Sequence, residues 1–162
     1  MKFFEDIQIG ESESVGSFTF TPEAIKSFAA RFDPQPFHLD EEAASRSHFK
    51  RLCASGWHTV CIRMRLMIES RRREDDERRA RGEPFGVLGP SPGFRDLKWL
   101  KPVYAGDTVS YQTDVIEKRT LPKRPGWGLV TSLNTGKNQR GEMVVSFIST
   151  AFVERRSADP AT

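Results

Sequence analysis

The chain is poor in cysteine: among 162 residues there are only Cys53 and Cys61. They are eight residues apart in a region whose pattern predicts mostly helix, and a rise of about 1.5 Å per residue would separate them by about 12 Å, beyond disulfide reach. We therefore expect reduced thiols, as is usual in cytoplasmic proteins. The sequence has no CxxC or HxxxH pairing, so it predicts no metal site.

Long hydrophobic runs are also missing. No apolar segment approaches the roughly 20 residues needed to cross a bilayer, and the N-terminal MKFFEDIQIGESESVG lacks a basic stretch followed by an apolar run. We expect a cytoplasmic protein with no membrane partner. The length is sufficient for one domain with a real hydrophobic core but short for two.

The formal net charge of +3 is local and does not describe a basic surface. Between Arg63 and Arg81 eight arginines face five acids, which accounts for the whole excess. Because four of the five acids precede an arginine by four residues, which is the more favourable orientation, a solvated helix explains this composition and no nucleic-acid partner is expected. The predicted pairs are Glu69–Arg73, Glu74–Arg78, Asp75–Arg79 and Glu77–Arg81.

Helices are predicted in the first half of the chain. A short strand, SFTFTP, leads to Thr21, which is placed to cap a helix over 22–32 with proline at its first position. A second helical turn is expected at 40–44. From Trp57 a longer helix should bury an apolar stripe with helical spacing. The stripe consists of Val60, Cys61, Met64, Met67 and Ile68.

Strands are predicted in the second half. Glycine and proline mark residues 82–93 as a loop, and β-branched and aromatic residues favour strands over 94–100, 108–118, 128–137 and 143–154. The resulting α+β architecture is a single domain over 1–155 in which an antiparallel sheet covers the long helix. Residues 156–162 form a polar tail.

The most informative phrase is FAARFDPQPFHLD, residues 28–40. It resembles the signature of MaoC-like dehydratases and R-specific enoyl-CoA hydratases, in which an aspartate and, five residues later, a histidine flank an Asn-Pro. Gln35 stands where that family usually has asparagine, and Phe32 where glycine is common. Two further stretches, FKRLCASGW (49–57) and WLKPVYAGDTV (99–109), resemble the same family in the same order.

The resemblance implies a hot-dog fold and an acyl-CoA hydratase or dehydratase of fatty acid metabolism, with a coenzyme A thioester as substrate and no other cofactor. Asp33 and His38 would hold one water as an acid–base pair, because histidine titrates near neutral pH and aspartate is a ready acceptor. The backbone amide of Gly56, at a helix start, would stabilise the thioester oxygen. Gln35, Ser55 and Trp57 are the candidate substrate-binding residues.

Each of these residues also has a purely structural interpretation. Asp33 could simply end a helix, and Ser55 could be a plain N-cap. His48 is predicted to be exposed, whereas His58 faces the acyl pocket or, more often in such positions, packs in the core. Trp57, like Trp99, is favoured as a core or interface residue over a substrate contact.

Two other functions remain open. A hot-dog thioesterase is the first, although such enzymes usually place a carboxylate near the start of the central helix and residues 57–68 contain none. A non-catalytic acyl-CoA-binding subunit is the second, suggested by Gln35 and Phe32. We also expect at least a homodimer, since a lone hot-dog unit leaves a sheet edge unpaired. The 82–93 loop is predicted near the site mouth or the dimer surface.

Overall fold

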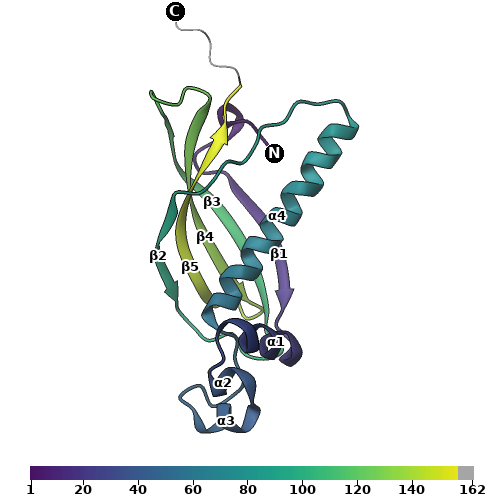
Figure 1. Cartoon of the computed structure of the whole chain (residues 1–162), viewed down its shortest axis with the longest axis vertical. Helices are drawn as coiled ribbons and strands as arrows, with labels where there is room; N and C mark the ends of the chain where they lie inside the picture. The colour runs from purple at the N-terminus through teal and green to yellow at the C-terminus, as the bar shows by residue number, and fades with distance from the viewer. Residues whose placement is uncertain (157–162) are drawn as a thin grey trace, which may run out of the picture.

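A computed structural model describes residues 1–156; the rest of the predicted tail, 157–162, lies outside the described residues. A five-stranded antiparallel sheet runs the length of the molecule, with one long helix lying across it (Figure 1). The strand order is β1-β3-β4-β5-β2. The strands are β1 (Ser12–Thr19), β2 (Gly93–Trp99), β3 (Thr108–Thr120), β4 (Trp127–Asn138) and β5 (Met143–Glu154). This is the predicted hot-dog architecture in one domain.

The short helices α1 (Pro22–Phe32), α2 (Pro36–Leu39) and α3 (Glu41–Arg46) gather at one end of the sheet, and the N-terminal 3-10 turn η1 (Phe4–Asp6) lies at the other (Figure 1). The turn η1 precedes β1, and α1, α2 and α3 follow it. Thr21 caps α1 as predicted, because its hydroxyl accepts from Ala24 N at 3.2 Å. Asp40 caps α3 in the same way at 2.8 Å. The helix α2 was not predicted.

The long helix α4 (Gly56–Ala80) begins where expected, but the predicted buried stripe is wrong. Cys61 and Met64 are exposed, and the other three members are only partly buried. The fully buried residues are His58, Thr59, Ile62 and Arg63. The buried face of the helix is therefore mixed: it contains two polar residues and one charged residue beside Ile62. Hydrophobic periodicity does not predict a face of this composition.

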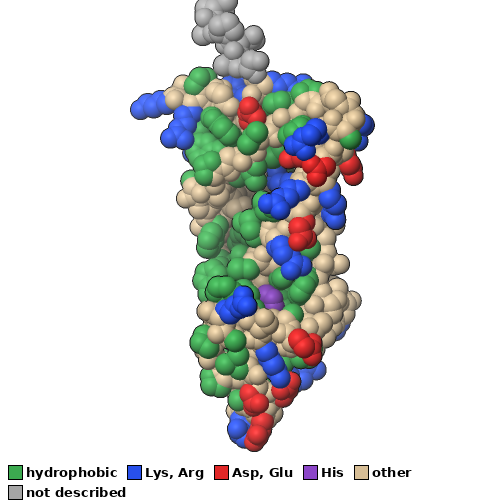
Figure 2. Space-filling view, turned by 45° about the vertical axis from the view of Figure 1, so that its right-hand side comes forward, with side chains coloured by type: hydrophobic (Ala, Val, Ile, Leu, Met, Phe, Trp, Pro, Cys, Tyr) green, Lys and Arg blue, Asp and Glu red, His purple; other side chains and the backbone are tan. Residues whose placement is uncertain are grey.

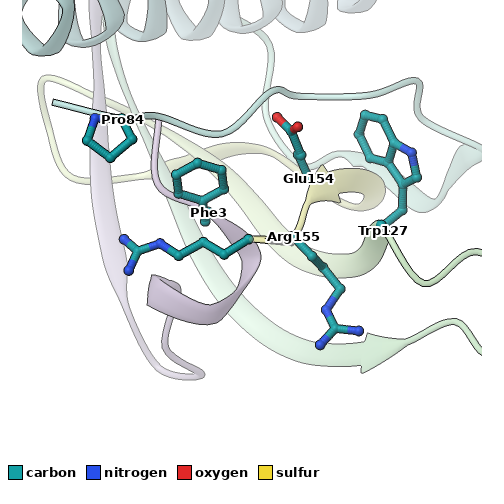
Figure 3. A pocket seen from close by; sticks show the side chains of 7 residues that line it. Phe3, Pro84, Trp127, Glu154 and Arg155 are labelled. Carbon is teal, nitrogen blue, oxygen red and sulfur yellow. The ribbon is translucent and has the colours of Figure 1, made fainter. Parts of the chain in front are cut away.

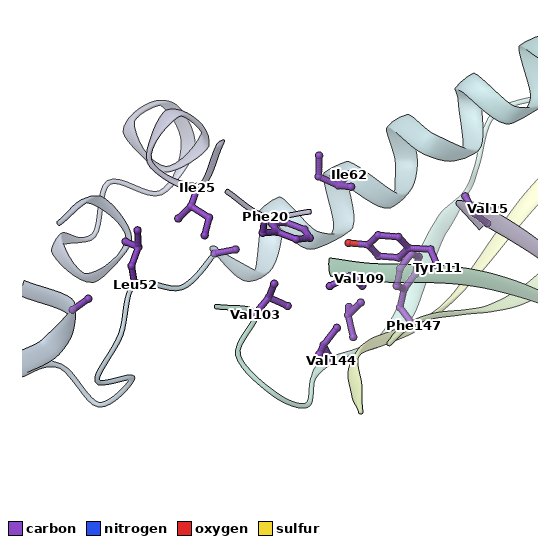
Figure 4. Packing of buried hydrophobic residues seen from close by; sticks show 13 residues of the cluster. Val15, Phe20, Ile25, Leu52, Ile62, Val103, Val109, Tyr111, Val144 and Phe147 are labelled. Atoms are coloured by element: carbon purple, nitrogen blue, oxygen red, sulfur yellow. The ribbon is translucent and has the colours of Figure 1, made fainter. Parts of the chain in front are cut away.

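The main core lies between α4, α1 and the sheet (Figure 4). Ile62 from α4, Phe20 from the segment after β1, and Tyr111 from β3 meet there. The Tyr111 hydroxyl donates to the Thr59 carbonyl at 3.0 Å and thereby ties the helix to the sheet. A second cluster, which includes Phe4 and Val153, closes the other end.

The charged end of α4 forms ion pairs, though mostly not the predicted ones. Arg78 pairs with Glu74 as expected. Asp75 instead accepts the N-terminal ammonium of Met1, and the neighbouring ion pairs are Arg65–Glu69, Arg79–Asp76 and Arg81–Glu83. Figure 2 shows these positive and negative side chains alternating along the helix beside a hydrophobic flank. No helix among residues 1–156 is long and apolar enough to cross a membrane.

The loop between α4 and β2 packs at the end of the molecule opposite α2 (Figure 1). Gly86 N donates to the Met1 carbonyl at 3.0 Å, and Gly89 N donates to that of Phe152 at 2.8 Å. The part of the prediction that placed this loop at the mouth of the Asp33 site is therefore wrong. Its alternative place, a subunit surface, stays a prediction.

The buried position of Ile62 provides a test of this core. Ile62→Ala should lower the free energy of unfolding by about 2–5 kcal/mol, whereas Ile62→Val should lower it by about 0.5–1.5 kcal/mol, because the smaller deletion leaves a smaller cavity. Denaturant unfolding followed by circular dichroism measures both. A loss below about 1 kcal/mol for Ile62→Ala would contradict the observed packing.

Candidate active site

Asp33 and His38 face each other at the junction of α1 and α2. Asp33 is the residue that ends α1, since Pro34 follows it and disfavours further helix. His38 lies on α2, which begins at Pro36, with Gln35 as its N-cap. The imidazole Nε2 lies 3.5 Å from Asp33 Oδ2. The structure thus brings together the two groups that the sequence singled out.

The second ring nitrogen of His38 is anchored. Its Nδ1 lies 2.7 Å from the carbonyl oxygen of Cys53, and because a carbonyl only accepts, Nδ1 carries the proton in this contact. In the neutral ring, Nε2 is then the nitrogen that carries a free lone pair. This nitrogen faces Asp33. The anchor itself was not predicted, because the sequence interpretation placed Cys53 in a helix.

Cys53 lies in an extended segment that pairs with the stretch before β3. Cys53 and Tyr104 form an isolated antiparallel bridge, Ala54 N donates to the Val103 carbonyl at 2.8 Å, and Ala105 N donates to that of Leu52 at 3.0 Å. The predicted separation of Cys53 from Cys61 along one helix is therefore wrong. Both thiols are nevertheless free, and burial raises the pKa of Cys53 to about 11.

Asp33 is held as a carboxylate. Partial burial acts to raise its pKa, but hydrogen bonds from Ser55 and Gln35, together with the attraction of His38, outweigh burial and leave the pKa below its usual value. The Gln35 side-chain amide donates to Asp33 Oδ1 at 2.8 Å. Gln35 thus supplies an amide donor, as the asparagine usual in the family would. Its longer side chain allows this donor to bond to Asp33.

Gly56 begins α4 behind its N-cap, Ser55. The Ser55 hydroxyl accepts from Trp57 N at 3.3 Å. Within residues 1–156, the Gly56 N–H has no hydrogen-bond acceptor, as expected at a helix start. A Cβ at Gly56 would lie 2.4 Å from Cε2 of Trp99, so glycine is needed here because an indole ring covers it.

The remaining candidate residues differ in their burial and in their contacts. Trp57 is half exposed and meets the Trp99 ring edge-on at 5.2 Å, so it is not a core residue. His48 is exposed, as predicted. His58 packs, stacked on Phe28 at 4.4 Å, and burial lowers its pKa to about 4. No group of three metal-ligating side chains occurs in the described part of the chain.

Two hollows open elsewhere. One, at the far end of the sheet, is lined by Phe3, Pro84, Trp127, Glu154 and Arg155 (Figure 3). Its two arginines are already paired, Arg155 with Glu5 at 2.9 Å and Arg156 with Asp6 at 2.7 Å. The other is a cavity of about 680 Å³ between α4 and the sheet. Neither hollow includes Asp33 or His38 in its lining.

Comparison with known proteins places this geometry in a family. The model of the MaoC like domain matches residues 7–125. The uncharacterized protein YdeM of Bacillus subtilis is 32% identical over 136 residues, which cover 84% of this chain and 87% of YdeM.

Solved structures agree with this family assignment. The MaoC-like dehydratase from Rhodospirillum rubrum superposes with a TM-score of 0.81 at 35% identity, covering 97% of this chain and 99% of that one. The R-hydratase PhaJ1 from Pseudomonas aeruginosa has the same fold, with a TM-score of 0.64 at 22% identity over 99% and 95% of the two chains. The chain therefore belongs to the MaoC-like domain family.

Proposed function

We propose that the protein is a hydratase or dehydratase that adds water to, or removes it from, a 2-enoyl-CoA thioester. One observation carries the proposal: the free Nε2 of His38 and the carboxylate of Asp33 lie 3.5 Å apart at the start of α4. Membership of the MaoC-like family, which includes hydratases, supports it.

The hydration step is derived from these groups. Asp33, ionised, accepts a hydrogen bond from the water and orients it. His38 Nε2 takes one proton as the hydroxyl oxygen bonds to Cβ and the C=C π electrons move toward the thioester carbonyl. Nε2 then returns the proton to Cα. The unpaired N–H of Gly56 stabilises the negative oxygen formed in between. Dehydration follows the same steps in reverse.

The surroundings of His38 favour its role as the base. The anchor at Cys53 fixes which nitrogen is unprotonated, and burial of the ring (5% exposed) keeps bulk water from competing for it. Ser55 and Gln35 hold the Asp33 carboxylate, so we assign them positioning roles. Trp57, beside the helix start, is left as the candidate contact for the thioester.

Loss of either partner should remove most of the turnover. Asp33→Asn and His38→Ala are each expected to lower kcat/KM for crotonyl-CoA by about a hundredfold or more, the usual scale for a positioned acid or base. The loss of enoyl-thioester absorbance measures the rate. His48→Ala changes an exposed histidine outside the site and is the matched control, expected to stay near wild type. Wild-type rates in both site variants would exclude the proposed mechanism.

We further propose that the protein forms a homodimer through the β2 edge. Within residues 1–156, β2 pairs with β5 and its outer edge has no partner strand. Large apolar side chains are exposed along this edge and on the adjoining face of α4. They are Phe94, Trp99, Leu100, Trp57 and Met64. A second copy paired at this edge would bury them and would bring new side chains near Gly56.

A charge at this edge should separate the copies. Leu100→Asp is expected to shift the mass seen by light scattering from twice 18.4 kDa toward 18.4 kDa, since an aspartate in an apolar interface would be desolvated. Ile116→Asp, an equally apolar exposed position on β3, is the matched control and should leave the mass unchanged. A stable wild-type monomer with full activity would refute the dimer.

A further inference from the structure

The cavity between α4 and the sheet contains a buried positive charge without a counterion. Arg63 lines this cavity and is only 4% exposed. Its guanidinium donates to Thr113 Oγ1 at 2.6 Å, to Asn134 Oδ1, and to Met67 Sδ at 3.2 Å. Its Nε has no hydrogen-bond partner within the described residues. All its partners are neutral, so they satisfy hydrogen bonds and leave the charge uncompensated.

A second arginine lines the same cavity. Arg71, two turns further along α4, donates to Met1 Sδ at 3.0 Å, and its Nε is likewise buried and without a partner in residues 1–156. Burial and, to a smaller extent, the nearby charge of Arg71 lower the pKa of Arg63 to about 10, while Glu13 acts in the opposite direction. Both guanidinium groups remain charged at neutral pH.

Among the described residues, no acid around the cavity forms an ion pair with Arg63 or Arg71, although Glu13 attracts both through space. Glu11 is paired with Lys2, and Glu74 with Arg78. Glu13 also lines the cavity, but it is exposed and forms no ion pair within 4.0 Å in the described chain. A purely alkyl ligand would remove the remaining water from both arginines without supplying a negative charge. Desolvating two uncompensated positive charges in this way would cost binding free energy. An anion in the cavity would compensate the positive charge of the two guanidinium groups.

The cavity lining begins on α4 one helical turn beyond Gly56, although neither Gly56 nor the Asp33–His38 pair belongs to it. Val60, at its near end, lies one helical turn beyond Gly56, and Arg63 lies seven residues beyond Gly56. Seven residues of α-helix correspond to about 10 Å along the axis. A chain that starts at a thioester carbonyl bound to Gly56 and follows α4 would therefore reach Arg63 with its far end. Apolar residues of the cavity lining, including Val60 and Phe147, suit methylene groups.

We propose that this cavity binds the far end of the acyl chain and that this end carries a carboxylate, recognised by Arg63 with Arg71 behind it. The substrate class is thus an enoyl-CoA whose acyl group is a dicarboxylic acid joined to coenzyme A at one end. This inference rests on the proposed hydratase function, because that function places the thioester at Gly56.

Pairs of enoyl-CoAs matched in chain length, ending in a methyl group or in a carboxylate, test the assignment. Wild-type kcat/KM should favour the carboxylate by about tenfold or more, the scale of one charge-assisted hydrogen bond. Arg63→Met should abolish this preference by raising KM for the carboxylate substrate, with turnover of the methyl substrate retained. Arg73→Met changes an exposed arginine of the same helix outside the cavity lining and should keep the preference.

If Arg63→Met fails to fold, a second variant at the protein surface tests the same preference for a carboxylate. Glu13→Gln removes the negative charge that competes with the ligand at the cavity, at an exposed position where folding is not at risk. It should lower KM for the carboxylate substrate several-fold and leave that for the methyl substrate unchanged. Equal effects on both substrates would overturn the inference.

Binding separates failure of this inference from failure of the proposed function. Calorimetry with the Asp33→Asn variant and saturated acyl-CoAs should give tighter binding of the carboxylate-ended compound whether or not the enzyme is a hydratase. If the wild-type enzyme converts methyl-ended substrates and not carboxylate-ended ones, the inference is refuted but the proposed hydratase function stands. Equally tight binding of the free dicarboxylic acid, without coenzyme A, would identify a separate anion site and refute an acyl-end role.

Discussion

The pairing of residues 52–54 with residues 103–105 is the constraint on which the site depends. Two backbone hydrogen bonds, which together make the Cys53–Tyr104 bridge, fix this short segment in front of α4. The Cys53 carbonyl that orients His38, the Ser55 hydroxyl that supports Asp33, and the first amide of α4 all follow from it within four residues. The His38 ring is therefore held from both sides: Nε2 faces Asp33 at the α1–α2 junction, and Nδ1 is bonded to the segment that pairs with residues 103–105.

The parts that could be predicted from sequence are those governed by local chemistry. Thr21 followed by proline fixes the start of α1, and Pro34 fixes its end. The strands follow from β-branched and aromatic composition, and their predicted bounds differ from those of β2 to β5 by at most two residues. Asp33 and His38 could be paired through the resemblance of residues 28–40 to a family signature, and the two prolines between them restrict the loop that holds them.

The parts that could not be predicted depend on tertiary contacts. Arg63 reads as one of many arginines in a charged helix, and only the positions of Thr113 and Asn134 on neighbouring strands make it a buried one. The apolar stripe with Met64 was assigned to the core because periodicity locates a face without saying what it meets. Within this chain that face meets the cavity and the free β2 edge.

The indole of Trp99 over Gly56 has a consequence for how this protein varies. Because the ring occupies the space of the missing Cβ, any larger residue at position 56 requires a smaller one at position 99, on a strand 43 positions later in the chain. The two positions are therefore expected to change together among relatives. The tryptophan at the edge of the sheet and the glycine at the start of α4 would then be retained or replaced together. Covariation of these two positions in an alignment would locate the end of β2 without any structure.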